Sequence, residues 1–273
     1  MLFRSDTFFK FHHTLQEFLG SANFAPMDNA SSKGHVGALI FIVGSLCVCG
    51  LALLIATPFA LGSSIFMTEI SPKFGEKFYR PMVEIFAGIP SVVYGWVGLT
   101  VLIPFLKKVF DLQVGHSILA ASLVLSIMIF PSITSVASDA IRAVSKETRM
   151  AAYGLGSTRW QAIFHVLLPA CLSRIMTGVI LAAGRGFGEA AVLLYTTGSG
   201  SDLRWNNFSF TSPTSPINVL RPAETLSIQI WNLQTNGQDR ALANLSSAVL
   251  MILVLAFSIG ANVWSRHISK KQA

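Results

Sequence analysis

Charged residues are scarce in this chain. Asp, Glu, Lys and Arg together make up 12% of its 273 residues, whereas about 25% is usual for soluble globular domains. Hydrophobic residues make up 52% of the chain. So little charge argues against an ordinary soluble domain, which must present a polar surface to water. It favours a chain that lies within a membrane.

Patterns that would indicate catalysis are also missing from the sequence. There is no Gly-x-x-x-x-Gly-Lys-Ser/Thr phosphate loop, so we expect the chain itself neither to bind nor to hydrolyse ATP. There is no Ser-His-Asp grouping on a soluble scaffold and no spacing typical of metal ligands. Cys47 and Cys49 point to different faces of a helix, and Cys171 lies far along the chain, which argues against a disulfide or metal site. We therefore expect no enzyme activity and no cofactor.

Long apolar segments are what the chain has instead. Four stretches contain no charged residue, namely 34–68, 85–106, 112–138 and 241–265. A fifth stretch, 175–195, is apolar except for Arg185 and Glu189. Because about 20 apolar residues cross a bilayer as an α-helix, the sequence predicts five spanning helices and an all-α, multi-pass membrane protein that contacts the lipid bilayer.

The positions of the basic residues predict the orientation. If residues 139–174 are cytoplasmic, then 69–83 and 266–273 are cytoplasmic as well. These three regions hold eleven basic residues, Lys73, Lys77, Arg80, Arg142, Lys146, Arg149, Arg159, Arg174, Arg266, Lys270 and Lys271. The opposite side, without the N-terminal segment, holds five, Lys107, Lys108, Arg204, Arg221 and Arg240. An excess of basic residues on the cytoplasmic side is typical of membrane proteins. It explains the net charge of +7 without a nucleic acid partner.

The N-terminal segment, residues 1–36, is predicted to be external or interfacial. The transmembrane domain then covers 37–265, with an external loop at 198–240 and a cytoplasmic tail at 266–273. Residues 1–20 carry several charges, so they are a poor span, and they lack the long apolar core of a signal peptide. Instead of a span or a signal peptide, residues 1–20 could form an interfacial amphipathic helix with their phenylalanines on one face.

The polar loop 139–172 is the most informative segment. In it Ala151 and Ala152 are followed by Gly156 and, after nine further residues, by Val-Leu-Leu-Pro, which ends at Pro169. This spacing resembles the cytoplasmic EAA loop of ABC-importer permeases, which reads Glu-Ala-Ala, three residues, Gly, nine residues, Ile-x-Leu-Pro. The alternative is an ordinary cytoplasmic loop with an amphipathic helix.

The resemblance implies that a short helix of this loop enters a cleft of an ATPase subunit. The residues implied in this coupling are Glu147, Met150, Ala151, Ala152, Gly156, Arg159, Leu168 and Pro169. Gly154 and Gly156 are expected at a corner between two short helices, and Leu155, Trp160, Ile163 and Phe164 are expected to anchor one face. The motif's Glu is Met150 here, and the nearest acid, Glu147, lies about one turn earlier. The charge contact to the ATPase is therefore moved or missing.

Prolines interrupt three of the predicted spans, at Pro58, Pro90 and Pro131. Proline inside a span frees a carbonyl group and kinks the helix. The stretch Ala-Gly-Ile-Pro-Ser-Val-Val-Tyr-Gly, residues 87–95, is similar to a helix of the permeases of the phosphate-specific (Pst) importer. We interpret Gly88, Pro90 and Pro131 as kink positions that let helices rock during gating.

Gly-Arg-Gly-Phe-Gly-Glu, residues 184–189, places two opposite charges inside a predicted span. A lone arginine at mid-membrane costs about 2.5–3.5 kcal/mol or more. Arg185 and Glu189 are four residues apart, so they are predicted to share a helix face and to pair. Gly184 and Gly188 form a small-xxx-small surface for another helix. One interpretation is a structural ion pair between two permease subunits. The other is that Arg185 faces the translocation path and binds an oxyanion with two parallel hydrogen bonds.

These motifs together resemble the permease subunits of the Pst importer, of the PstC or PstA type, from about Phe18 to the C-terminus. Pst permeases have an Arg and a Glu at the positions of Arg185 and Glu189. The resemblance implies a type I ABC-importer permease fold in a bacterial inner membrane, with the first transmembrane helix of the family apparently lacking.

The resemblance also implies the function and the partners. The function is phosphate import by alternating access, driven by ATP that a separate subunit binds. The partners are a sister permease in a heterodimer, two copies of a cytoplasmic ATPase and an external phosphate-binding protein. Sulfate, molybdate or tungstate are alternative substrates. An ATPase-independent transporter or channel is a further alternative, but it would have no use for an EAA loop.

Overall fold

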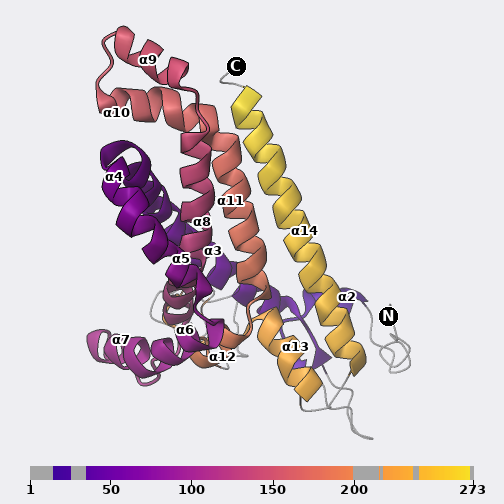
Figure 1. Cartoon of the computed structure of the whole chain (residues 1–273). Helices are drawn as coiled ribbons and strands as arrows, with labels where there is room; N and C mark the ends of the chain where they lie inside the picture. Colours follow the sequence, from indigo (N-terminus) through magenta and orange to yellow (C-terminus); the bar gives the residue numbers. More distant parts are fainter. Residues whose placement is uncertain (1–14, 26–34, 199–214, 216–217, 236–239, 271–273) are drawn as a thin grey trace, which may run out of the picture. The chain divides into compact units, whose positions relative to one another are not determined.

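The computed structural model describes residues 15–25, 35–198, 215, 218–235 and 240–270. Over these residues the chain is almost entirely helical (Figure 1). The first part of the predicted N-terminal segment, residues 1–14, lies outside the described residues, as does much of the predicted external loop 198–240.

Helices and two short strands follow one another along the chain. Their order is α2 (Leu15–Gly20), β1 (Phe24–Ala25), β2 (His35–Val36), α3 (Leu39–Ile65), η1 (Phe66–Ile70), α4 (Pro72–Phe74), η2 (Gly75–Tyr79), α5 (Arg80–Gly88), α6 (Ser91–Val97), η3 (Gly98–Leu102), α7 (Ile103–Val109), α8 (Ile118–Arg142), α9 (Lys146–Gly154), α10 (Arg159–Ala162), η4 (Ile163–Leu167), α11 (Leu168–Gly188), α12 (Ala191–Thr196), α13 (Leu226–Thr235) and α14 (Arg240–Lys270). The elements labelled η are single π-helical turns that continue an adjoining α-helix. The strands β1 and β2 pair antiparallel over two residues each, a small exception to the all-α prediction.

Five helical segments of the described chain are long and apolar enough to cross a membrane. They are Leu39–Ile70, Ser91–Val109, Ile118–Arg142, Arg159–Gly188 and Arg240–Ser265. This confirms the predicted number of spans. The fourth span differs from the prediction of 175–195, because its helix begins within the polar loop and ends at Gly188, before Glu189.

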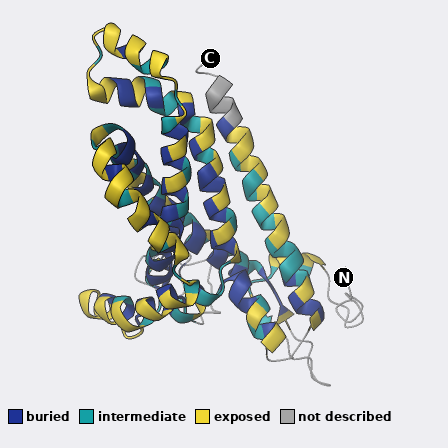
Figure 2. Cartoon of the chain, viewed as in Figure 1, coloured by how far each residue is buried: buried dark blue, intermediate teal, exposed yellow. Residues whose placement is uncertain are grey.

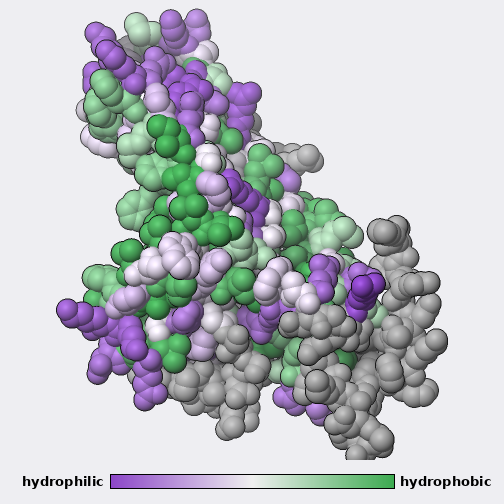
Figure 3. All heavy atoms as spheres, turned by 60° about the horizontal axis from the view of Figure 1, so that its bottom comes forward, coloured by the Kyte–Doolittle hydropathy of each residue, from purple (hydrophilic) through white to green (hydrophobic). Residues whose placement is uncertain are grey.

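The outward faces of these spans are apolar. Leu54, Ile127 and Ile259 are each more than half exposed, at 73%, 52% and 63%. Figure 3 shows such hydrophobic side chains as broad green areas on the surface of the molecule. Exposed apolar area on this scale on a water-soluble protein would be unusual, so these faces are suited to lipid or to another membrane helix.

The described residues divide into two compact units, each with its own packing. The first unit takes its residues from Met1–Ala52, Pro90–Leu125 and Phe187–Leu253, and the second from Leu53–Ile89, Ser126–Gly186 and Val254–Ala273. In the first unit, Phe41 of α3 packs on Leu226 of α13, and its ring meets that of Phe24 edge to face at 4.9 Å. A neighbouring cluster joins Phe18 of α2 to Leu242 at the start of α14.

The core of the second unit joins the membrane helices to the polar loop. Ile65 of α3, Ile141 of α8 and Ile175 of α11 form one buried cluster with Ile163 and Leu167 of η4. The hydroxyl of Ser64 also donates a hydrogen bond of 3.0 Å to the carbonyl oxygen of Thr134. The polar loop therefore packs into one core with α8, which precedes it, and α11, which follows it.

The chain leaves the helical conformation at Pro90, where a kinked helix was predicted. Ile89 and Pro90 are extended, with ψ angles of 129° and 138°. A residue before proline is disfavoured in the helical region because of the proline ring, so α5 ends at Gly88 and α6 begins at Ser91. Pro58 and Pro131, by contrast, lie inside α3 and α8, which continue through them.

Gly44 in α3 makes the tightest helix contact of the first unit. A Cβ at this position would lie 2.2 Å from the carbonyl oxygen of Glu224, whereas one at Gly50 of the same helix would meet nothing within 4 Å. We expect Gly44→Ala to lower the free energy of unfolding by about 1–3 kcal/mol through overpacking. Gly50→Ala should be neutral or stabilising, because alanine favours a helix. Thermal unfolding of the two variants in detergent checks this, and equal midpoints would contradict it.

Candidate coupling loop and substrate path

The helix α9 of the polar loop begins with a defined cap. The hydroxyl of Ser145 accepts a hydrogen bond of 3.2 Å from the backbone N–H of Thr148. Glu147 lies in the first turn and is fully exposed, and its pKa is lowered by a backbone N–H and by the Ser145 hydroxyl. A carboxylate is favoured at a helix N-terminus, so Glu147 places an exposed negative charge in the first turn of α9.

The corner between α9 and α10 lies at Gly156, as predicted. Gly156 has a φ angle of +82°, which favours glycine, whereas Gly154 is the last helical residue of α9. The next helix begins with a capping box, in which Thr158 N–H donates to Gln161 Oε1 at 2.8 Å and Gln161 N–H donates to Thr158 Oγ1 at 3.4 Å. The turn and the cap together fix the direction in which α10 leaves the corner.

Arg149 fastens α9 to the membrane helices of the second unit. Its guanidinium pairs with Glu69 of η1 at 2.5 Å and donates a second hydrogen bond to the carbonyl oxygen of Ile141 at 2.6 Å. Arg142 pairs with Glu76 of η2 in the same way at 2.5 Å. Glu69 is only 9% exposed at its side chain, so losing its partner would leave a nearly buried charge alone. The two ion pairs could not be read from the sequence, because their partners lie at least 66 residues apart.

Most of α9 and α10 is exposed (Figure 2). Large apolar side chains are among the exposed residues. Met150, Leu155 and Trp160 are 69%, 89% and 57% exposed, and the Trp160 ring stacks on that of Phe164 at 5.8 Å. Ile163, which was predicted to share this face, is instead buried at 3% in the core of the second unit. Exposed apolar residues of this kind mark an interaction surface.

The other predicted coupling residues take different positions along the loop. Ala152 is buried and Ala151 is exposed, both in α9. Arg159 is the first residue of α10 and is exposed. Leu168 packs against the core of the second unit, and Pro169 is the second residue of α11, directly after the π-helical turn η4.

Arg185 lies in the last turn of α11 on an exposed face of the fourth span. Thr177 and Leu181 lie two turns and one turn before it and are exposed as well. Gly184 lies beside Val254 of α14, whose Cγ1 would be 4.0 Å from a Cβ at that position. Because an arginine facing lipid is costly, this face is suited to another protein or to a water-filled path.

Glu189 lies outside the helix that holds Arg185, so the predicted shared helix face is wrong. The backbone leaves the helix at Glu189 and Ala190, and α12 begins at Ala191. Glu189 Oε1 accepts a hydrogen bond of 3.4 Å from Val192 N–H, and the Glu189 carbonyl oxygen accepts one of 2.9 Å from the Ser227 hydroxyl. The carboxylate thus caps α12, and Ser227 of α13 satisfies a carbonyl group freed by the break.

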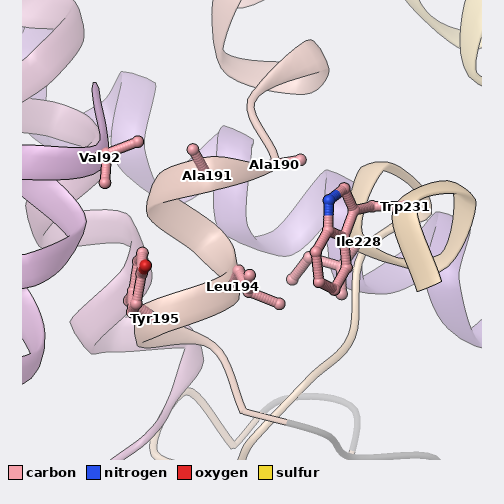
Figure 4. Close-up of a pocket in the computed structure, with 7 residues that line it drawn as sticks. All are labelled: Val92, Ala190, Ala191, Leu194, Tyr195, Ile228 and Trp231. Atoms are coloured by element: carbon pink, nitrogen blue, oxygen red, sulfur yellow. The ribbon is translucent and has the colours of Figure 1, made fainter. Parts of the chain in front are cut away.

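A small cavity lies next to this break in the first unit (Figure 4). Its volume is about 270 Å³, and it is lined by Val92, Ala190, Ala191, Leu194, Tyr195, Ile228 and Trp231. The lining comes from α6, α12 and α13 and from Ala190 of the break, and it contains no charged side chain. The cavity alone therefore offers little to recognise an ionic substrate. No group of three or more metal-ligating side chains occurs in the described part of the chain.

Solved structures show which class of protein this fold defines. A chain of the inward-facing MetNI methionine ABC transporter matches with a TM-score of 0.61 at 17% identity, covering 82% of this chain and 93% of that chain. A bacterial alginate ABC transporter in complex with an alginate-bound periplasmic protein matches with a TM-score of 0.62 at 18% identity, covering 98% of this chain and 90% of that chain. The fold is that of a type I ABC-importer permease, as predicted.

Comparison of sequences gives the family. The family of binding-protein-dependent transport system inner membrane components matches residues 60–273. The probable ABC transporter permease protein YqgH of Bacillus subtilis is 41% identical over 241 residues, 88% of this chain and 74% of that protein. The phosphate transport system permease protein PstC of Mesorhizobium japonicum is 32% identical over 262 residues, which are 89% of this chain and 75% of that protein.

The chain therefore belongs to the family of binding-protein-dependent transport system inner membrane components. It is a multi-pass permease of the inner membrane and not the catalytic subunit. An ABC permease works with an ATPase and a binding protein, so both are partners of this chain.

The corner at Gly156 tests the coupling role. We expect Gly156→Val to abolish substrate uptake, because a β-branched residue is strongly disfavoured at positive φ and would move α9 relative to α10. Gly156→Asn is the matched control, because asparagine tolerates this conformation. Uptake and ATPase activity are measured in the reconstituted complex, at equal expression. Normal uptake by the valine variant would contradict the coupling assignment.

Proposed function

We propose that this chain is a permease subunit of a phosphate importer. The observation that carries the proposal is the likeness to PstC proteins over most of the chain, with 32% identity to that of Mesorhizobium japonicum and 31% to that of Pasteurella multocida. The exposed arginine on the fourth span supports it, because guanidinium groups match phosphate oxygens in geometry and charge.

Another oxyanion is the second candidate substrate. YqgH and YqgI of Bacillus subtilis are 41% and 37% identical to this chain, and their names give no substrate. Sulfate, molybdate and tungstate are also tetrahedral oxyanions, so an arginine in the path would suit them too. The choice among them depends on the geometry around the arginine and on the partner that delivers the substrate.

The proposed partners complete a transporter of type I architecture. A sister permease pairs with this chain as a heterodimer, two copies of a cytoplasmic ATPase bind the coupling loops, and an external phosphate-binding protein delivers the substrate. On this chain, the ATPase meets Glu147 and the exposed apolar side chains of Met150 and Leu155. An apolar contact at Met150 thus stands where the EAA motif has a charged one.

Arg185 and Glu189 have separate roles in the proposed path. Arg185 is exposed on the span, and in the assembled transporter it faces the path and binds the oxyanion. Glu189 ends the helix beside it and caps α12, which sets where the helical backbone stops next to the path. The breaks at Gly88–Pro90 and at Glu189 interrupt the helices near the proposed path, and Pro131 adds a flexible point in α8. Rocking at these points opens and closes the path.

Substitution of Arg185 tests the proposed path. We expect Arg185→Lys to lose at least about 90% of labelled-phosphate uptake, because lysine keeps the charge but lacks the planar two-pronged donor. Arg185→Gln should lose it entirely. Arg174→Lys is the matched control, since it changes another exposed arginine of α11 in the same way and should leave uptake near normal.

Assembly of the complex is measured for every variant, by recovery of the partner subunits on purification. Glu189→Gln should assemble, because an amide oxygen still accepts the hydrogen bond from Val192. Near-normal uptake by an assembled Arg185→Gln complex would remove Arg185 as a substrate ligand and leave it a packing role only.

A further inference from the structure

Residues 218–223 join α8, α12 and α13 in the first unit, and Asn218, Arg221 and Ala223 of this segment are buried. Their carbonyl groups cap the start of α8, since Ile118 N–H donates to Arg221 O at 3.0 Å and Leu119 N–H donates to Val219 O at 2.8 Å. Ala223 N–H donates to the carbonyl oxygen of Thr197, just after α12, at 3.3 Å. The backbone of this segment thus has a structural role, which leaves the side chain of Arg221 to be explained.

The guanidinium of Arg221 is enclosed and largely without partners. Arg221 is 2% exposed and is the largest fully buried side chain of the described residues. Its Nη1 donates to the carbonyl oxygen of Pro222 at 3.4 Å, but Nε and Nη2 have no hydrogen-bond partner. Burial lowers the pKa of Arg221, yet an arginine remains charged in proteins. A buried charge without a partner is strongly unfavourable.

No described carboxylate is placed to neutralise it. The acid nearest in sequence, Glu224, is engaged with Asn232, whose Nδ2 donates to Glu224 Oε1 at 2.8 Å. The ion pairs between described residues all lie elsewhere, in the second unit. The positive charge of Arg221 therefore calls for an anion from outside the described part of the chain.

Ser215 adds a second unused polar group to this junction. It is 0% exposed, and its Oγ has no hydrogen-bond partner. Asn218 N–H donates to Ser215 O, and Arg221 N–H donates to Asn218 O, both at 3.4 Å. These two backbone hydrogen bonds link Ser215 to Arg221 through Asn218.

The geometry points to an oxyanion site formed by Arg221 and Ser215. Nε and Nη2 make up one edge of the guanidinium, which binds two oxygens of a carboxylate or phosphate in parallel, and the Ser215 hydroxyl supplies a third donor. The ligand is a small free inorganic oxyanion held closed off from water. That it is phosphate rests on the proposed function, and the site is then a second holding point for the substrate, apart from Arg185.

Equilibrium dialysis with labelled phosphate tests this site in the purified, full-length complex. The Arg185→Gln background removes the proposed path site from the measurement. We expect saturable binding that sulfate weakens by competition and that chloride at equal ionic strength does not. Arg221→Lys should weaken the binding at least about tenfold and Ser215→Ala about threefold, because hydrogen bonds to charged groups are stronger than neutral ones. Arg240→Lys, at the exposed start of α14, is the control and should bind normally.

The outcomes separate this site from the proposed function. Uptake is measured in the complex with Arg185 intact. If that complex transports no phosphate, while binding in the Arg185→Gln background depends on Arg221 and Ser215, the result would support the site and contradict the proposed substrate. If that complex transports phosphate, while the Arg185→Gln complex shows no saturable binding, the result would overturn the site and leave the proposed function standing. Binding unchanged by both Arg221→Lys and Ser215→Ala, or displaced equally by chloride, would also overturn it. Ser215→Ala keeps the test decisive if Arg221→Lys does not assemble.

Discussion

The membrane offers no water to satisfy polar groups, and this constraint explains how the chain ends and restarts its helices. Two interruptions near the spans are answered by specific donors or acceptors. At the end of α11, Glu189 caps α12 and Ser227 bonds the freed carbonyl group. At the start of α8, the carbonyl oxygens of Val219 and Arg221 take the first amide groups. These polar groups therefore stabilise the points where the helices end and restart.

Specific polar and apolar contacts also hold the polar loop 139–172. Arg149 is held by Glu69 and by the carbonyl oxygen of Ile141, and Ile163 is buried with Ile65 and Ile175. The helix α9 is thus attached to η1 and α8, and η4 packs with α3, α8 and α11, all within the second unit. The apolar surface around Leu155 and Trp160 is left free for a partner. Rigid attachment on one face and exposed apolar groups on the other are what a mechanical coupler requires.

Sequence patterns predicted the parts of this structure that depend on local composition. Five apolar stretches gave five spans, and the spacing around Gly156 gave the corner of the loop. The end of α11 was missed, because apolar residues continue past Glu189 and only the contacts of Glu189 show that the helix stops. The pair of Arg149 with Glu69 and the isolation of Arg221 were also beyond prediction, since both depend on which distant segments meet. The roles of Arg185 and Glu189 in transport stay predictions.

The central claim is that this permease moves phosphate with the energy of a partner ATPase. Uptake of labelled phosphate by cells that lack their own phosphate uptake, and that express this chain with its partner subunits, tests it most directly. The account predicts ATP-dependent uptake that excess unlabelled phosphate abolishes and that equal excesses of sulfate, molybdate or tungstate leave largely intact. Uptake abolished by one of those oxyanions at lower concentration than by phosphate would contradict the assignment of the substrate.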